Sequence, residues 1–148
     1  MTARATLIDG PFSPEALYRD FLARLGEEAG AVVTFTGLVR GGDVTGLLLE
    51  HHPLRTAVSL EAIAAAGAAR FEVSGIEVVH RCGLIGPGEP IVWVAAAAPH
   101  RRAAFEAADY LMDRLKTEAV FWKREEATGG GRWIEPTEAD RHAATRWE

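Results

Sequence analysis

Residues 99–126 read PHRRAAFEAADYLMDRLKTEAVFWKREE and combine the clearest helix signal, a strand signal and the only two lysines of this chain. Apolar residues in the first part are spaced by three and four positions, which is the period of one face of a helix. They are Ala104, Phe105, Ala108, Leu111, Met112 and Leu115. Pro99 stands where prolines commonly begin a helix. The pattern predicts an amphipathic helix over about residues 101–116.

The end of the same segment predicts a strand. Residues 120–125, VFWKRE, are rich in side chains that favour strands. Because side chains alternate between the two faces of a strand, Phe121, Lys123 and Glu125 are expected on one face. Trp122 then points to the opposite face, and a place in the core or in an interface is expected for Trp122 and Trp133.

The lysines of this segment indicate chemistry. Lys116 and Lys123 are the only lysines, and the other fourteen of the sixteen Lys and Arg residues are arginines. A lysine ammonium is a compact charge whose pKa falls on burial, so it can release a proton and act as a base or nucleophile. The alternative for Lys116 is structural, because any cation is favourable in the last turn of a helix. The presence of both lysines around Phe121-Trp122 favours a functional site.

His100 and Arg101 lie at the opposite end of the expected helix. Free backbone N–H groups, the helix dipole and a guanidinium can together bind an anion there, and an exposed pair without a ligand is the alternative. A continuous helix of sixteen residues separates His100 from Lys116 by roughly 24 Å. The two ends therefore cannot contact one small molecule within a single chain. A two-fold dimer could bring the His100 end of one copy to the lysine end of the other.

The whole composition is that of an ordinary globular protein. The 148 residues predict a single domain, 1–148, and the net charge of −5 argues against a broad nucleic-acid surface. Cys82 is the only cysteine, which excludes an internal disulfide and is typical of a reducing compartment. No signal peptide and no membrane-spanning run is recognisable, so we expect a cytoplasmic protein with neither nucleic-acid nor membrane partners.

The complete chain predicts the order β-α-β-β-α-β-β-α-β-β-α. The turn at residues 41–43, Gly-Gly-Asp, favours a hairpin between its two flanking strands. This order suggests an α+β fold with a mixed, largely antiparallel sheet and helices packed mainly on one side. The expected strands are residues 5–8, 31–40, 46–52, 76–84, 90–98, 120–125 and 132–135, and the expected helices are residues 13–25, 56–72, 101–116 and 137–144.

Other chemical motifs receive little support. The potential metal ligands His51, His52, His80, Cys82 and His100 are scattered and lack zinc-site spacings. No phosphate-binding glycine loop and no nucleophile elbow is present. Neither a metal nor another cofactor is therefore expected.

Two arginines outside the segment have an ordinary interpretation as well as a functional one. Arg40 ends a strand beside a glycine turn, where it can contact a ligand or simply be exposed. Arg81 is expected to form a structural salt bridge.

Several groups of residues, in this order and spacing, are similar to one known family. They are residues 30–37 (GAVVTFTG) with Val39-Arg40, residues 49–51 (LEH), His80-Arg81 with Gly83, His100-Arg101 with residues 104–107 (AFEA), Met112-Asp113 with residues 115–117 (LKT), residues 121–125 (FWKRE) and Arg132-Trp133. The chain resembles the large, catalytic subunit of molybdopterin synthase, the MoaE family, over about residues 10–147. The resemblance implies an α/β hammerhead-like fold with a small β subdomain.

The activity implied by the resemblance is a sulfur transfer in molybdenum cofactor biosynthesis. The sulfur comes from the C-terminal thiocarboxylate of a small ubiquitin-like subunit ending in Gly-Gly. The acceptor is cyclic pyranopterin monophosphate, which becomes the dithiolene of molybdopterin. Two large subunits form a homodimer, and one small subunit at each outer end completes a heterotetramer. A non-catalytic scaffold that binds anions and the Gly-Gly tail is one alternative, and phosphate-ester hydrolysis is another.

The resemblance also implies roles for residues of this chain. Lys116 and Lys123 are the catalytic residues, as proton donor, proton acceptor or oxyanion stabiliser. Those expected to bind substrate are Arg40, His100, Arg101, Phe35 and Met112, with His100 and Arg101 contributed across the dimer. The chain departs from the family in a shorter 41–46 loop, in His52 where tyrosine is common, and at Pro136-Thr137.

Overall fold

Strands β4 (Gly75–Ile85) and β5 (Pro90–Ala98) form the centre of the sheet in the computed structural model, which describes residues 2–148. They are antiparallel neighbours and are buried along most of their length. Strand β2 (Ala31–Leu38) is antiparallel to β5 and ends the sheet on that side. The centre of the fold is therefore a sheet whose two faces must both be covered by other elements.

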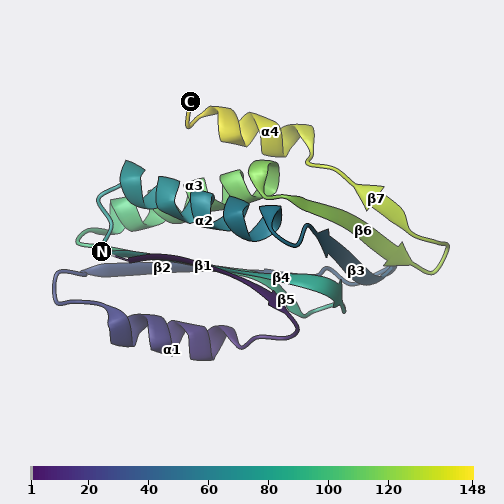
Figure 1. Ribbon diagram of the computed structural model, residues 1–148, viewed down its shortest axis with the longest axis horizontal. Coiled ribbons are helices and arrows are strands. Elements are labelled where there is room, and N and C mark those ends of the chain that lie inside the picture. Colours follow the sequence, from purple (N-terminus) through teal and green to yellow (C-terminus); the bar gives the residue numbers. More distant parts are fainter. Residues whose placement is uncertain (1) are drawn as a thin grey trace.

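The other edge of β4 has two successive partners. Strand β1 (Thr2–Asp9) runs parallel to β4 along residues 75–82, and β3 (Val44–His51) is antiparallel to residues 83–85. Strands β6 (Phe121–Ala127) and β7 (Arg132–Ile134) continue the sheet from β3. Strands β3, β6 and β7 thus extend beyond the main sheet (Figure 1). The predicted mixed, largely antiparallel sheet with a small β extension is confirmed.

The expected hairpin between residues 31–40 and 46–52 is wrong. The turn at residues 41–43 exists, with Gly42 at φ +84°, but β2 pairs with β5 while β3 pairs with β4 and β6. A turn signal reports only local geometry. The partners of these strands are decided by the need to cover the edges of the buried strands β4 and β5, which lie far away in the sequence.

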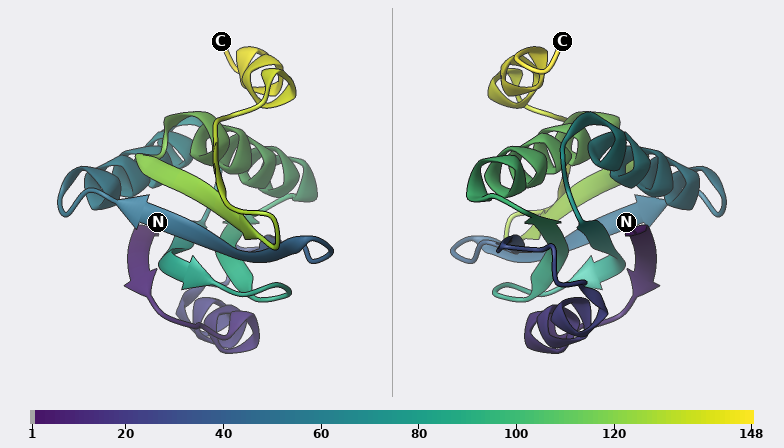
Figure 2. Two further views of the ribbon diagram at one scale, coloured as in Figure 1. Left: turned by 90° about the vertical axis from the view of Figure 1, so that its right-hand side faces the viewer. Right: turned by 90° about the vertical axis from the view of Figure 1, so that its left-hand side faces the viewer.

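Helices cover the sheet unequally, as predicted. Helix α1 (Pro14–Arg24) lies alone on one face, whereas α2 (Arg55–Arg70) and α3 (Arg101–Glu118) cover the other, and α4 (Glu138–Thr145) lies outside α3 (Figures 1 and 2). Ser13 caps α1, and its hydroxyl accepts a hydrogen bond from the backbone N–H of Ala16. Among residues 2–148, no helix has the length and apolar character needed to cross a membrane.

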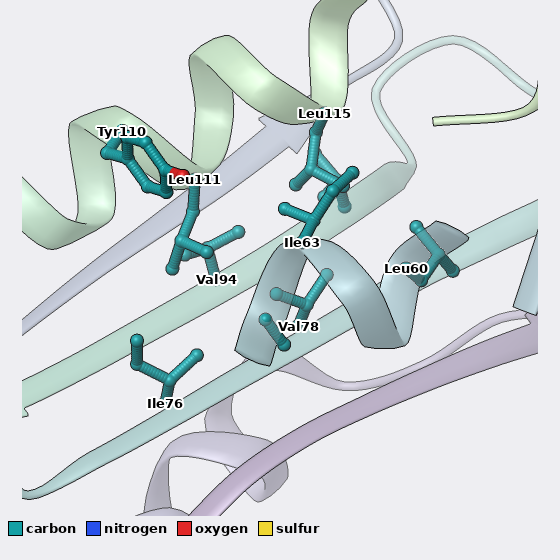
Figure 3. Close-up of a cluster of buried hydrophobic side chains, with 10 residues drawn as sticks. Leu60, Ile63, Ile76, Val78, Val94, Tyr110, Leu111 and Leu115 are labelled. Atoms are coloured by element: carbon teal, nitrogen blue, oxygen red, sulfur yellow. The ribbon is translucent and has the colours of Figure 1, made fainter. Parts of the chain in front are cut away.

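The main core lies between α2, α3 and the centre of the sheet. Leu60 and Ile63 of α2 meet Leu111 and Leu115 of α3 above the sheet (Figure 3). The side chains beneath them are Ile76, Val78 and Val94. Burial of one apolar side chain contributes about 1.5–3 kcal/mol, so this cluster holds the axis of α3 over β4 and β5.

The two tryptophans of the β extension are exposed. Trp122 and Trp133 keep 51% and 53% of their surface accessible, so a place in the core is wrong for both. A place in an interface with another chain stays a prediction. The other two tryptophans do pack. Trp93 is buried and meets Phe21 edge to face. Trp147 contacts Phe71 and Tyr110 edge to face, and its indole N–H donates to Asp113.

A buried hydroxyl fixes the chain at the entry to β6. The Thr56 side chain donates to the Val120 carbonyl at 2.5 Å and accepts from the His52 backbone N–H at 2.8 Å. The Val120 N–H donates in turn to the Ser59 hydroxyl at 3.1 Å. The start of α2 therefore holds both the end of β3 and the residue that precedes β6.

We expect Thr56→Val to lower the free energy of unfolding by about 1–3 kcal/mol, because it leaves a partly buried carbonyl and a partly buried N–H without their side-chain partner. Thr56→Ser keeps both hydrogen bonds and is expected to cost about 1 kcal/mol for the lost methyl group. Urea denaturation followed by tryptophan fluorescence measures both. Equal stability of the valine variant and the unmodified protein would contradict this account of the junction.

Candidate functional site

The two lysines line one cavity. Lys116 lies in the last turn of α3 and Lys123 in β6, and the chain between them reverses at Ala119 and Val120. The cavity has a volume of about 690 Å³ and opens at the end of α3, between the sheet and the segment that follows β7. The reversal places two amines that are seven residues apart in the sequence on the walls of one space.

The alternation predicted for the strand after α3 is confirmed. Phe121, Lys123 and Glu125 all line the cavity, whereas Trp122 is exposed and is not among the lining residues. The cavity wall thus carries an aromatic ring, an amine and a carboxylate from one strand face. Glu125 is paired with Arg132 of β7 at 3.0 Å, which holds the carboxylate at the rim.

Three other residues predicted to bind substrate line the same cavity. Phe35 and Arg40 come from β2 and the segment after it, and Met112 lies one helical turn before Lys116. Arg40 is exposed, so its guanidinium can reach a ligand at the cavity mouth. Phe35, Arg40 and Met112 therefore lie where the sequence analysis expects substrate contacts, and their roles remain predictions.

A glycine keeps the β2 side of the cavity in place. A Cβ atom on Gly37 would lie 2.7 Å from a methyl group of Val92 on β5. A larger residue at this position would therefore clash with the Val92 side chain. The pairing of β2 with β5 also shifts register between Gly37 and Leu38. Beyond the irregularity, Val39 exchanges backbone hydrogen bonds with Gly88 and Glu89, and Arg40 follows it.

His100 and Arg101 do not reach the cavity of their own chain. Both are exposed at the N-terminal end of α3, and His100 makes no capping hydrogen bond. They are absent from the residues that line the cavity. This agrees with the length of α3, which spans Arg101–Glu118 without interruption. An anion site at this end, and its contribution to a second copy, remain predictions.

The salt bridges of the described residues use arginine and not lysine as their cation. Neither Lys116 nor Lys123 takes part in any salt bridge within residues 2–148. Arg81 forms the structural pair expected of it, with Glu89 at 3.1 Å. The two ammonium groups therefore remain available to a ligand.

Burial changes the acid–base properties of Lys123. Its pKa falls from 10.5 to about 8, first because burial penalises the charged ammonium and then because Lys116 lies nearby with the same charge. Asp140 opposes this shift. Lys123 can therefore exchange a proton near neutral pH, as a general acid or base must.

The C-terminal segment forms a wall that the sequence analysis missed. Glu135, Pro136, Thr137 and Asp140 line the cavity. Asp140 and Thr137 form a capping box at the start of α4, with hydrogen bonds of 3.1 and 3.0 Å. Partial burial acts to raise the pKa of Asp140, but these bonds and the two lysines outweigh it and lower that pKa.

His80 is a second residue that the sequence analysis did not assign to the site. It is a buried strand residue, and its ring also lines the cavity beneath Phe121. The sequence signals are its place in the His80-Arg81 group shared with the family and its position in β4. It lies two residues after Val78 and four after Ile76, on the side of the sheet that faces α2 and α3. Among residues 2–148, no group of three or more His, Cys, Asp and Glu side chains is arranged to hold a metal ion.

Known proteins similar to this chain share both its sequence and its fold. The family model described as MoaE protein matches residues 7–118. The molybdopterin synthase catalytic subunit of Caulobacter vibrioides is 51% identical over 145 residues, 97% of this chain and 96% of that protein. That of Pseudomonas aeruginosa is 48% identical over 123 residues, 80% of this chain and 82% of that protein. The molybdopterin biosynthesis MoaE protein from Burkholderia ambifaria superposes with a TM-score of 0.82 at 37% identity, covering 99% and 98% of the two chains.

The electrostatic coupling of the two lysines can be measured directly, because they are the only lysines of the chain. We expect Lys123 to titrate near pH 8 in NMR spectra of the protein labelled with ¹³C-lysine. Lys116→Gln removes a neighbouring positive charge and should raise the pKa of Lys123, whereas Lys116→Arg keeps that charge and should leave it low. A Lys123 signal that titrates near 10.5 in the unmodified protein would contradict the burial argument.

Proposed function

Since this chain belongs to the MoaE family, we propose that it is the catalytic subunit of a molybdopterin synthase and acts as a sulfurtransferase. The sulfur donor is the C-terminal thiocarboxylate of a small ubiquitin-like protein that ends in Gly-Gly. The acceptor is cyclic pyranopterin monophosphate, and the product carries the dithiolene of molybdopterin. The observation that supports this most directly is the cavity shared by two unpaired amines, one with a pKa near 8.

The sulfur transfer that opens the cyclic phosphate requires proton movements at two places. The thiocarboxylate sulfur forms a bond to a carbon of the pterin side chain, and the cyclic phosphate opens as its oxygen leaves. Water then attacks the thioester carbon, so that the carrier departs as a carboxylate and the sulfur stays on the pterin. The leaving oxygen needs a proton, the attacking water must lose one, and the tetrahedral intermediate carries a negative charge.

Lys116 and Lys123 suit these requirements. A protonated lysine donates to the leaving oxygen or stabilises the oxyanion, whereas a neutral lysine accepts the proton of water. Lys123, with its pKa near 8, is populated in both forms around neutral pH. Arginine cannot replace it in this role because its guanidinium keeps its proton.

The cavity also matches the size and charge of the proposed ligands. Its β2, β3 and β5 side is apolar, through residues such as Val39, Leu47 and Val92, and can take the backbone of a glycine tail. Arg40 at the mouth supplies a guanidinium that can bind phosphate through two hydrogen bonds. The cavity therefore offers a place for the tail and a place for the phosphate.

A second copy of the chain is proposed to complete the site. His100 and Arg101 are exposed, unpaired with any acid within residues 2–148, and too far along α3 to reach their own lysines. Strand β2 ends the sheet, so its outer edge is open to a partner. Leu38 and Phe105, on β2 and α3, keep 54% and 60% of their surface accessible. A homodimer that covers this region can deliver His100 and Arg101 to the partner's cavity.

A single-turnover reaction tests the catalytic role of Lys123. With a preformed thiocarboxylate carrier and saturating pterin substrate, we expect Lys123→Ala to lower the rate of sulfur transfer by about 100-fold or more. Lys123→Arg keeps the charge but cannot release a proton, so it should be similarly slow. Carrier affinity, measured by calorimetry, should change little in both variants.

Two outcomes of that experiment would contradict the proposal. Full single-turnover sulfur transfer by Lys123→Ala would remove the residue from the chemistry. A loss of carrier affinity that accounts for the whole loss of activity would favour a non-catalytic scaffold. Turnover of the cyclic phosphate without any sulfur donor would instead indicate a phosphate-ester hydrolase.

The contribution of a second copy can be tested by mixing two inactive variants. One carries Lys123→Ala and the other carries His100→Ala with Arg101→Ala. If the two ends meet across a dimer, one of the two sites in each mixed dimer is intact, so random exchange should restore about a quarter of the unmodified activity. If the ends act within one chain, the mixture should remain inactive.

A further inference from the structure

We propose that His80 is a positioning residue of this site, whose unprotonated Nε2 atom accepts a hydrogen bond from the Lys123 ammonium when that amine turns toward the imidazole; the bond is not formed in this structure. The importance of this role for catalysis rests on the proposed function, but the hydrogen bond itself can be tested without it. The proposal is based on where the imidazole lies. His80 is buried in β4, its ring stacks on Phe121 and bonds to the Arg81 carbonyl, and it lines the cavity that the two lysines also line.

The ring of His80 is held in one orientation. Only 4% of the residue is accessible, and the ring stacks on Phe121 with centroids 4.2 Å apart and an interplanar angle of 29°. Its Nδ1 atom lies 2.9 Å from the Arg81 carbonyl oxygen. Since a carbonyl oxygen only accepts hydrogen bonds, Nδ1 must carry the proton.

The tautomer then follows. A neutral imidazole has one N–H and one lone pair, so protonated Nδ1 leaves Nε2 as an acceptor. Burial lowers the pKa of His80 to about 4, and the ammonium groups of Lys123 and Lys116 contribute to the shift although the Arg81 carbonyl opposes it. The imidazole is therefore neutral at the pH at which Lys123 exchanges its proton.

The Nε2 atom is open to the cavity. No side-chain hydrogen bond within residues 2–148 uses it, and it is not among the fully enclosed polar atoms that lack a partner. Because His80 lines the cavity, the free lone pair is reached from there. A lysine ammonium is a hydrogen-bond donor, so one of the two lysines that line this cavity can donate to the Nε2 lone pair.

Lys123 is the amine within reach. It lies two residues after Phe121 on the same strand face, which separates their Cβ atoms by roughly 7 Å, and Phe121 is in contact with the His80 ring. The flexible stem of lysine spans such a distance. The other charged groups around this cavity are Arg40 at the end of β2, Lys116 on α3, Glu125 on β6, Glu135 after β7 and Asp140 on α4.

A bond from the ammonium to Nε2 has two consequences. It holds the Lys123 amine in one orientation within the cavity. It also favours the charged form of Lys123, which opposes the effect of burial on its pKa. His80 would thus keep the pKa of Lys123 from falling further. A carboxylate in the same place would instead pair with the ammonium as an ion and hold its proton more strongly.

The test is the titration of Lys123 in the isolated full chain labelled with ¹³C-lysine, compared for two variants of similar chemistry. His80→Asn can keep the bond to the Arg81 carbonyl but has no polar atom at the Nε2 position, whereas the longer side chain of His80→Gln can reach it. We expect the midpoint of Lys123 to move about one pH unit lower in His80→Asn and to stay within a few tenths of a unit in His80→Gln.

The direction of the shift separates this role from simple damage. Water that entered a loosened cavity would solvate the ammonium and raise the pKa of Lys123, whereas loss of an acceptor lowers it. An unchanged midpoint in His80→Asn, a midpoint that rises, or equal shifts in both variants would overturn the proposal. Because no sulfur donor or pterin is needed, the result does not depend on the proposed activity.

The tautomer can be checked without any substitution, which keeps the proposal testable if the variants do not fold. Long-range ¹H–¹⁵N correlation spectra of the unmodified protein should show His80 with protonated Nδ1 and free Nε2, and the Nε2 signal should shift as Lys123 titrates. A proton on Nε2 would overturn the proposal. In single-turnover assays, His80→Asn should lower the rate constant of sulfur transfer and move its pH dependence to lower pH, while His80→Gln should retain both.

Discussion

The packing of α3 on the two central strands is the constraint on which the site depends. Leu111 and Leu115 are buried against β4 and β5, and this contact fixes the axis of the helix over the sheet. Once the axis is fixed, the last turn of α3 can end only near the start of β6, because two residues join the helical segment to the strand. The lysines before and after this turn then face one cavity.

The chain uses its two kinds of cation for different purposes. Arginines form all of the salt bridges of the described residues, including the pair of Arg146 with Asp113 at 2.7 Å that ties the C-terminus to α3. A guanidinium is suited to such pairs because it keeps its charge and binds carboxylates in a planar geometry. Within the described residues, neither Lys116 nor Lys123 forms a salt bridge, and both line the cavity, where a change of protonation is useful.

The same helix that joins the lysines to the core also separates them from His100 and Arg101. A continuous helix of 18 residues keeps its two ends far apart, so His100 and Arg101 cannot contact the same small molecule as Lys116 of their own chain. The proposed activity requires a phosphate, a pterin and a peptide tail in one site, and a dimer would enlarge the site that receives them. The open edge of β2 and the exposed apolar side chains near it lie on the side where such a partner would bind.

Local patterns in the sequence determined the order of the eleven elements, the limits of α3 to within two residues, the Ser13 cap and the shared face of Phe121, Lys123 and Glu125. These features depend on residues close to one another in the chain, where periodicity and capping act. Only the tertiary structure decided that β2 and β3 do not pair, because strand partners depend on covering a distant buried sheet. It also decided the low pKa of Lys123, the entry of His80 into the cavity and the wall formed by residues 135–140, since burial and contact across the fold are properties of the assembled chain.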